Sequence, residues 1–261
     1  MFYAINKFGD RVHISRAITS ETYFCPACRA RVFMKKGDVV SHHFYHETVK
    51  HCDPWYGDRL SEWHCEMQRL FPDYAREVVI YNSDNSEFHI ADAFLSNQNG
   101  DYVFEFQHSS ISVDEFLARS IFYLNLGYSL VWVFDLRDSN KPKCIYYQDV
   151  EHYSKYKKFI WPGKDRLRWL DSDRVRSFLE ECLGENIKLS ILFHTYSGLG
   201  EKYDINYSNG FDSIRWRYVD PFAKEECFIK PDFSSRERLS SFYGDLFSRE
   251  EFVKRIKALI E

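Results

Sequence analysis

Two acidic side chains, Asp92 and Glu105, lie in consecutive short apolar segments of the run from His89 to Ser110. The turn-forming sequence from Asn97 to Asp101 separates the two segments, which predicts a β-hairpin. Residues i and i+2 of a strand share a face, so Glu105 and Gln107 should point the same way. If Asp92 also faces that side, the two carboxylates could hold Mg²⁺ for phosphoryl chemistry. The alternative is the polar face of an exposed hairpin.

The N-terminal part of the chain contains a second group of side chains that could bind a metal. Cys25 and Cys28 form a C-x-x-C, which on a tight turn brings two thiolates within reach of one Zn²⁺. His46 and Cys52 follow further along the chain and could complete a tetrahedral site, with His43 as the alternate for His46. Four protein ligands leave no open position, so this zinc would be structural. The alternative is a set of reduced cysteines and surface histidines.

A regular order of helices and strands is predicted around the acidic pair. Apolar residues at helical spacing predict a helix that begins with Asp58 as its N-cap and ends before Pro72. Three strands should follow, and the capping box Ser112–Glu115 should start a second helix, which Gly127 ends before a buried strand. We expect the strands at 76–81, 88–95, 102–107 and 128–134. This order predicts an α/β (α+β) fold with a mixed sheet flanked by helices.

These motifs, taken in order, resemble those of the competence protein CoiA-like nuclease family. The resemblance covers roughly residues 23 to 135 and rests on Cys25-Pro26-Ala27-Cys28, His43-Phe44-Tyr45-His46 with Cys52, Ser61-Glu62-Trp63-His64, His89-Ile90-Ala91-Asp92, the run from Phe104 to Ser112, Arg119 with Tyr123, and Val131-Trp132-Val133-Phe134-Asp135. The family is similar to the PD-(D/E)XK nuclease superfamily, whose core topology matches the predicted order of elements. The resemblance therefore implies a restriction-endonuclease-like core, an N-terminal zinc-finger-like module and a role in DNA processing.

The resemblance also implies roles for particular residues. Asp92 and Glu105 would be the carboxylates that bind a catalytic Mg²⁺ or Mn²⁺, and Glu62 would add an acidic group near the metal. Gln107 stands where many members of the superfamily have a catalytic lysine. The first helix departs from the family pattern, because it carries Met67-Gln68 where an aromatic residue followed by lysine is expected. This departure argues against DNA contact by this helix in the family's way.

A neutral amide at Gln107 cannot lend positive charge or shuttle a proton, so a second metal or a nearby histidine should assist. His64 and His108 are the candidates, because an unperturbed histidine titrates near neutral pH. The alternatives are a hydrogen-bonded structural histidine at position 64 and a polar loop at position 108. Helical spacing places His64 nearly opposite Glu62, so we expect neither to face the metal unless the helix begins irregularly.

Basic residues that could bind DNA lie at Arg119 and in the run from Tyr153 to Trp169. In that run they are interleaved with aromatic residues, a pattern that suits single-stranded or distorted DNA. We expect phosphate contacts from Lys155, Lys157, Lys158, Arg166 and Arg168; the alternative is an amphipathic segment whose rings complete the core. Arg119, one helical turn from Tyr123, could reach a phosphate, support Gln107 or form a simple surface pair.

The composition limits the class of protein. The chain has 261 residues, of which 44% are hydrophobic and 18% aromatic, and this is ample for a buried core. The net charge of −4 provides no global basic surface, which argues against a pure DNA-coating protein but permits a local basic patch. We see no apolar run of ~18 residues and no signal-peptide pattern, so we expect a cytoplasmic protein without a membrane partner.

We expect a zinc-binding module at 1–57, the nuclease core at 58–150 and an α+β extension at 151–261. The extension should contain a helix at 173–183, a strand at 187–193 and a helix opened by the capping box Ser248–Glu251. The expected function is that of a Mg²⁺- or Mn²⁺-dependent DNA endonuclease in competence, recombination or phage defence. Cleavage of both strands would favour a homodimer or a partner protein. The alternatives are a catalytically silent DNA-binding adaptor and a protein whose zinc module docks a partner.

Overall fold

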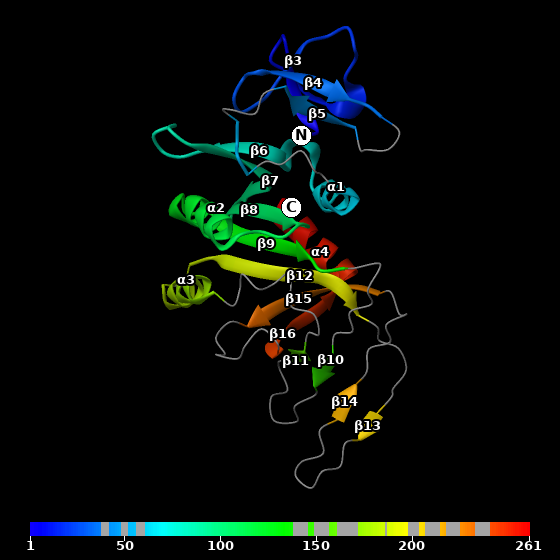
Figure 1. The fold of residues 1–261 in the computed structure, drawn as a ribbon, viewed down its shortest axis with the longest axis vertical. Helices are drawn as coiled ribbons and strands as arrows, with labels where there is room; N and C mark the ends of the chain where they lie inside the picture. The colour runs from blue at the N-terminus through cyan, green and yellow to red at the C-terminus, as the bar shows by residue number, and fades with distance from the viewer. Residues whose placement is uncertain are drawn as a thin grey trace. The chain divides into compact units, whose positions relative to one another are not determined.

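A computed structural model describes residues 1–37, 42–47, 52–55, 61–137, 146–148, 157–160, 172–185, 187–197, 204–206, 215–217, 225–232 and 241–261. The described chain forms two compact units, Met1–Glu105 and Phe106–Glu261. Both units combine sheets with a few helices, which confirms the mixed α+β class predicted from the sequence (Figure 1). Among these residues, no helix is long and apolar enough to cross a membrane.

The first unit begins with a five-stranded antiparallel sheet, drawn in blue in Figure 1. Its strands are β1 (Tyr3–Asn6), β2 (Arg11–His13), β3 (Tyr23–Phe24), β4 (Arg31–Lys35) and β5 (His43–His46), in the order β2-β1-β3-β4-β5. The short 3-10 helix η1 (Ile14–Arg16) follows β2. Ala4, Tyr23, Val32 and Phe44 are buried in one apolar cluster beneath these strands. The same cluster also includes Cys65 of the next helix and Ile90 of a later strand, so this sheet shares its core with the rest of the first unit.

The same unit continues with one helix and an antiparallel group of three strands. These elements are α1 (Glu62–Arg69), the 3-10 helix η2 (Asp73–Ala75), β6 (Arg76–Tyr81), β7 (Phe88–Asn97) and β8 (Gly100–Gln107). Asn97 lies opposite Gly100, so a two-residue loop joins β7 to β8 and the predicted hairpin is confirmed. The N-cap of α1 is Ser61, whose hydroxyl accepts a hydrogen bond from the backbone N–H of His64 at 3.1 Å. The helix thus starts later than predicted, because Ser61 caps it, and Asp58 lies outside the described residues.

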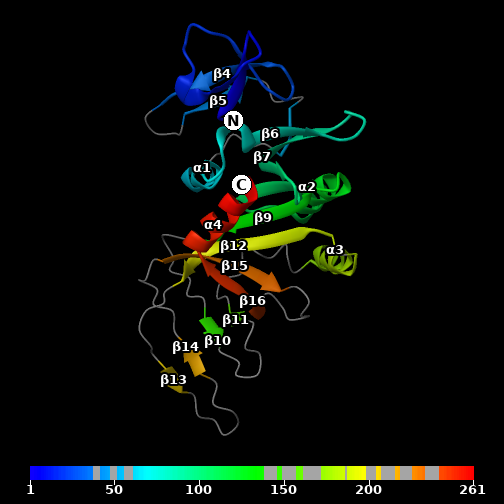
Figure 2. The same ribbon diagram turned by 180° about the vertical axis from the view of Figure 1, so that it is seen from behind.

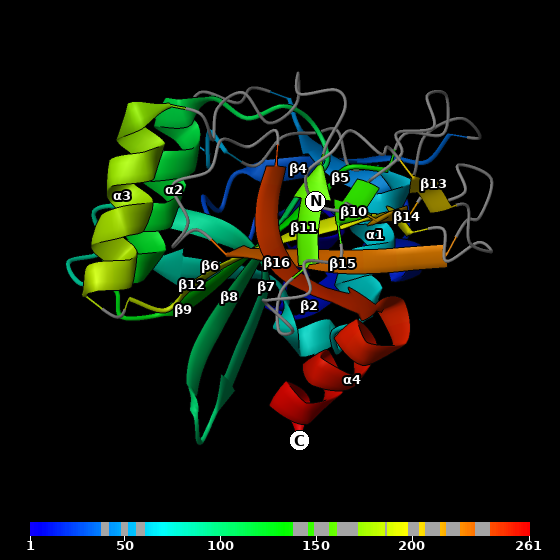
Figure 3. The same ribbon diagram turned by 90° about the horizontal axis from the view of Figure 1, so that it is seen from below.

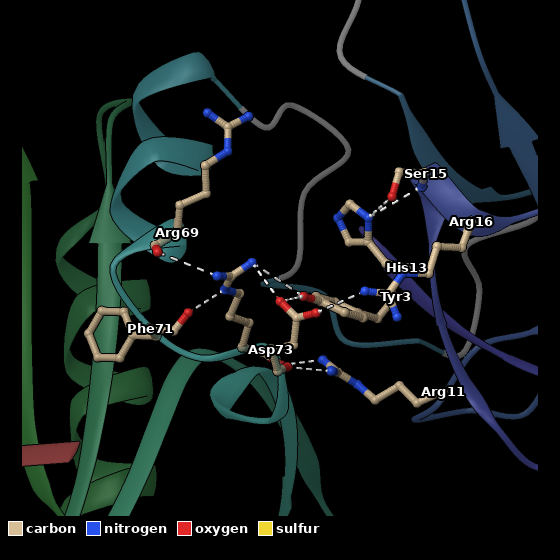
Figure 4. A network of polar contacts seen from close by, with 9 residues as sticks. Tyr3, Arg11, His13, Ser15, Arg16, Arg69, Phe71 and Asp73 are labelled. Atoms are coloured by element: carbon tan, nitrogen blue, oxygen red, sulfur yellow. Dashed lines mark hydrogen bonds and ion pairs between the residues drawn. The ribbon is translucent and has the colours of Figure 1, made fainter. Parts of the chain in front are cut away.

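Asp73 connects the N-terminal sheet to the segment between α1 and β6 (Figure 4). Its carboxylate accepts a hydrogen bond from the hydroxyl of Tyr3 at 3.2 Å and pairs with Arg76 at 3.0 Å. The guanidinium of Arg11 donates to the backbone carbonyls of Asp73, at 2.6 Å, and of Arg76. Arg16 adds a longer ion pair with Asp73 at 3.8 Å. The first sheet and the β6 strand are therefore held together by charged hydrogen bonds as well as by apolar contact.

In the residues that the structure describes, the second unit has three helices and a mixed sheet. Its elements are α2 (Val113–Asn125), β9 (Ser129–Asp135), β10 (Tyr146–Gln148), β11 (Lys157–Ile160), α3 (Asp173–Gly184), β12 (Leu189–Ser197), β13 (Asp204–Asn206), β14 (Arg215–Arg217), β15 (Glu225–Asp232), β16 (Ser241–Ser248) and α4 (Arg249–Ile260). The strands run in the order β13-β14-β10-β11-β16-β15-β12-β9. The pair β9–β12 is parallel, and the other pairs described in this unit are antiparallel.

Local sequence signals place the helices of this unit as predicted. The hydroxyls of Ser112 and Ser248 accept the N-capping hydrogen bonds of α2 and α4. Gly127 has a φ of 83°, a conformation that glycine adopts at little cost, and it ends α2. Helices α2 and α3 run side by side (Figure 3), and α4 packs on β15 and β16 (Figure 2). The helix predicted at 173–183 is α3, and the strand predicted at 187–193 is β12 with a later start.

Candidate functional site

The structure brings together the four side chains expected as zinc ligands. The ligand atoms of Cys25, Cys28, His46 and Cys52 all lie within 4.8 Å of one another. The closest contacts join the Cys28 sulfur to Nε2 of His46 at 3.3 Å and the sulfurs of Cys25 and Cys52 at 3.7 Å. His43, the expected alternate, is buried at the start of β5 and is not one of these four. The sheet positions the group, since the C-x-x-C follows β3 and His46 ends β5.

The chemistry of these four side chains suits zinc. Three thiolates and one imidazole are a common donor set of closed tetrahedral zinc sites. Zinc binds thiolates rather than thiols. The hydrogen bond between Cys25 and Cys52 lowers the pKa of Cys25 to about 4 and raises that of Cys52, while burial raises the pKa of Cys28, so zinc would displace protons from the latter two. The Cys₃His cluster is thus compatible with a structural zinc that would hold the turn after β3 against β5.

The second group of functional residues surrounds Asp92 and Glu105. Both side chains are buried, Glu105 completely, so the exposed polar hairpin considered from the sequence is wrong. The ladder between β7 and β8 pairs Ala93 with Phe104, and the same register sets Asp92 opposite Glu105. Residues directly opposite each other on neighbouring strands point to the same face. Two buried carboxylates on one face repel each other, so such a pair needs a positive partner.

Helix α1 presents one face to Asp92. Nε2 of His64 lies 3.1 Å from Oδ1 of Asp92, and the side-chain amide of Gln68 donates to the backbone carbonyl of Asp92 at 3.3 Å. His64 and Gln68 are one helical turn apart, which explains why both reach the same residue. Glu62 is exposed at the first position of the helix, and its place near a metal stays a prediction.

The acidic surroundings favour the protonated form of His64. Burial alone would lower the pKa of this imidazole, but the nearby carboxylates of Asp92, Glu77 and Glu105 outweigh it and raise the pKa. A protonated His64 supplies positive charge next to Asp92. His64 is the third residue of α1, and with Ser61 as the N-cap this position faces Asp92.

Glu77 on β6 is a third buried acidic residue beside Asp92 and Glu105. It was not predicted from the sequence. The paired residues on either side of Glu77 set it opposite Asp92 across β6 and β7. Its φ is 45°, an uncommon conformation for a residue with a side chain. The carboxylate accepts hydrogen bonds from the backbone N–H groups of Phe2 at 2.8 Å and Tyr3 at 3.0 Å. Glu77 thereby joins the start of β1 to β6, and neither contact leaves a signal in the local sequence.

Gln107 and His108, considered within the second unit, are held by neighbouring side chains. The amide of Gln107 donates to the carbonyl of Ser109 at 3.0 Å and contacts its hydroxyl at 3.1 Å. Nδ1 of His108 lies 2.8 Å from the buried carboxylate of Asp135, whose other oxygen accepts from Nε of Arg137 at 3.0 Å. Burial raises the pKa of Asp135, but the hydrogen bonds from His108 and Arg137 outweigh it and lower this pKa. A charged Asp135 favours the His108 tautomer with its proton on Nδ1.

The six residues expected to bind DNA do not all lie in the described part of the chain. Arg119 is buried, pairs with Glu115 at 3.3 Å and lies over the ring of Trp132, so the simple surface pair considered from the sequence is wrong. Lys157 and Lys158 lie on β11, where the backbone pairs with β16. The remaining three, Lys155, Arg166 and Arg168, lie outside the described residues.

A third polar group in the second unit surrounds Glu226 on β15. Arg137 and Arg249 contact its two carboxylate oxygens at 2.6 and 3.0 Å, and Nε2 of His194 lies 3.6 Å away. Contact with the His194 ring, together with the charges of Arg249 and Arg137, lowers the pKa of Glu226 to about 2. Burial keeps the pKa of His194 low, so the arginines supply the positive charge at neutral pH. This group lies among β9, β12 and β15 and holds these strands together.

Glu226→Gln should therefore destabilise the protein in a pH-dependent way. A depressed pKa stabilises the fold above pH ~4.5, and this contribution is lost as the pH falls toward 2. After discounting for solvent screening, the substitution should cost about 1–2 kcal/mol at pH 7 and progressively less below pH ~4. Urea unfolding at pH 7 and at pH ~2.5 measures this difference, with Glu250→Gln on the exposed first turn of α4 as the control. An equal cost at both pH values would contradict the assignment.

Comparison with known protein families defines the class of the protein. Residues 87–158, which include Asp92, Glu105 and His108, match the family model described as the nuclease-like domain of competence protein CoiA. Residues 7–54, which include the whole Cys₃His cluster, match the model of the N-terminal domain of the same protein. The chain is thus nuclease-like in its central part, and the two matches together support its assignment to the CoiA-like family. No curated protein and no solved structure matches it.

Proposed function

We propose that this protein is a metal-dependent DNA nuclease that hydrolyses phosphodiester bonds in DNA processing. The observation that carries the proposal is the buried pair Asp92 and Glu105, set opposite each other on β7 and β8 inside the region that matches a nuclease-like domain. Carboxylates are buried at a high cost in free energy unless a cation or a hydrogen-bond donor compensates them. A pair of this kind is suited to Mg²⁺ or Mn²⁺, which prefer oxygen ligands.

Asp92 and Glu105 would hold the metal ion, which when bound polarises the phosphate and lowers the pKa of a coordinated water. His64 contacts Asp92 from the side of α1 at 3.1 Å, and its protonated form would offset the charge of this carboxylate. Gln107 follows Glu105 by two residues on β8 and could orient the water through its amide. His108, whose Nδ1 is held by Asp135, could accept or donate a proton at Nε2.

The proposed architecture follows the division expected from the sequence. A zinc-binding module at 1–57 would precede a PD-(D/E)XK-like core at 58–150, and the extension at 151–261 would supply the surface for DNA. Basic and aromatic residues are interleaved in the run from Tyr153 to Trp169, a composition that suits single-stranded DNA. A homodimer or a partner protein would be needed to cut both strands of a duplex in one event.

A second candidate is a DNA-binding adaptor that keeps the nuclease fold without catalysis. The observation that favours it is Gln107, because an amide replaces the lysine of the superfamily and this amide already donates to Ser109. Without that positive charge, transition-state stabilisation would depend on the metal and on His108.

The experiment that separates the two candidates is a cleavage assay with the purified wild-type protein. Supercoiled plasmid and single-stranded DNA are incubated with Mg²⁺, with Mn²⁺ and with a chelator, and DNA binding is measured in parallel. The nuclease proposal predicts cleavage with either metal and none with the chelator. DNA binding without cleavage under all conditions would favour the adaptor.

A further inference from the structure

We infer that Asp53 is a positioning residue that ties the Cys₃His cluster to β7 and thereby sets the place of Asp92. Asp53 follows directly after Cys52, the last member of the cluster in the sequence. Its side chain is 1% exposed, and for a carboxylate this degree of burial requires specific partners. The consequence for Asp92 rests on the proposed function, whereas the connection between the cluster and β7 does not.

The carboxylate of Asp53 holds two consecutive residues of β7. Its Oδ1 lies 2.9 Å from Nδ1 of His89, and its Oδ2 accepts a hydrogen bond from the backbone N–H of Ile90 at 2.7 Å. Oδ1 also accepts from the backbone N–H of Trp55 at 2.9 Å, which folds the segment after Cys52 back on itself. One side chain thus joins the turn that carries a metal ligand to a strand 36 residues further along the chain.

The contact with Ile90 acts on the strand that carries the candidate catalytic residue. Backbone N–H groups inside a strand normally donate to a neighbouring strand, and here a side chain accepts that bond. Ile90 is also buried in the apolar cluster that includes Cys25, against which Cys52 packs. Asp92 lies two residues beyond Ile90 and so points to the same face of the strand. A displacement of Asp53 would therefore be passed to Asp92, and catalytic geometry tolerates only about 0.5 Å.

Metal binding at the cluster should strengthen this connection. Without a cation, the cluster is joined by the contacts of Cys25 with Cys52 at 3.7 Å and of Cys28 with His46 at 3.3 Å, so the segment that carries Cys52 is best held when the cluster is loaded. Since Asp53 is the next residue, its carboxylate keeps its place against β7 only when that segment is fixed. Zinc would thus serve the candidate active site without touching it.

His89 offers a matched control for this inference. Its Nε2 lies 3.0 Å from Oε1 of Glu87, and the Trp55 ring stacks on the imidazole. The Glu87 side chain is 53% exposed and lies outside the segment that carries Cys52. Glu87→Gln therefore perturbs the same histidine as Asp53→Asn while the backbone bond between Asp53 and Ile90 stays intact.

The test compares zinc-loaded wild type, Asp53→Asn and Glu87→Gln by hydrogen exchange of individual backbone amides. We expect the Ile90 amide to exchange at least about tenfold faster in Asp53→Asn, with the Leu95 amide of β7 unchanged and with Glu87→Gln close to wild type. Removing zinc from the wild type should accelerate the hydrogen exchange of the Ile90 amide in the same way. The Mg²⁺ concentration for half-maximal DNA cleavage should rise about tenfold in Asp53→Asn only.

Unchanged exchange at Ile90 in a folded, zinc-loaded Asp53→Asn variant would overturn the inference. An equal increase in the exchange rates of the Ile90 and Leu95 amides on zinc removal would also overturn the inference, because the cluster would then stabilise the whole hairpin. If Asp53→Asn does not fold, the inference is tested by the hydrogen exchange of the Ile90 and Leu95 amides after zinc is removed from the wild type. A wild type without nuclease activity would refute the proposed function, while the exchange measurement would still decide on the role of Asp53.

Discussion

Glu105→Gln is expected to lower the rate of DNA cleavage by more than about 100-fold while the protein stays folded. The glutamine amide is nearly isosteric with the carboxylate but carries no charge, so a metal that needs Glu105 should bind poorly. Loss of a residue that only supports a ligand typically costs ~10–100-fold, and loss of the ligand itself should cost more. Asp92→Asn should have an effect of similar size, since the register sets it opposite Glu105. The measurement is the initial rate of plasmid nicking at saturating Mg²⁺ or Mn²⁺.

Asp101→Asn is the matched control for this prediction. Asp101 lies on the same strand as Glu105, near the turn that joins β7 to β8, and it is partly exposed. Its loss should leave cleavage within about twofold of wild type, as is usual for a surface substitution away from the site. If Glu105→Gln and Asp101→Asn cleave DNA equally well, Glu105 does not bind the catalytic metal.

Cys28→Ser is expected to abolish zinc binding and to unfold the N-terminal module. Serine is a much poorer zinc ligand than a thiolate, and structural zinc contributes about 10–16 kcal/mol to the folding of small modules. This is comparable to the whole stability of most domains, which is about 5–15 kcal/mol. The measurements are the zinc content of the purified protein and its thermal unfolding. The expected results are less than one zinc per chain and a transition at clearly lower temperature.

Cys182→Ala provides the comparison for this second prediction. Cys182 is a buried thiol on α3, outside the Cys₃His cluster, so its loss should reduce packing without changing the zinc content. A Cys28→Ser protein with full zinc content and unchanged unfolding would show that the cluster does not bind zinc as a structural ion.

Features encoded by local sequence could be predicted. The caps at Ser112 and Ser248 depend on residues within one helical turn, and the hairpin depends on turn residues between two apolar runs. The four members of the Cys₃His cluster also followed from spacing, because zinc sites restrict both the donor types and their separation. Short-range rules suffice wherever the partners are close in the sequence.

The parts that could not be predicted depend on contacts between distant residues. The side of α1 that faces Asp92 depends on where the helix starts. With Ser61 rather than Asp58 as the N-cap, different residues of the helix point toward Asp92. Gln68 was noted only as a departure from the family pattern, although its position one turn after His64 was a usable signal. Asp53 had no such signal for its contact with β7, because its partners on that strand lie 36 and 37 residues away.

Mn²⁺ binding to the zinc-loaded protein is the most direct test of a catalytic metal site at Asp92 and Glu105. Titration followed by electron paramagnetic resonance reports binding without requiring a DNA substrate. We expect Mn²⁺ to bind the wild type and Asp101→Asn with equal affinity, and to bind Asp92→Asn and Glu105→Gln at least about tenfold more weakly. Equal Mn²⁺ affinity in all four proteins, or no binding to the wild type, would contradict a metal site at these two carboxylates.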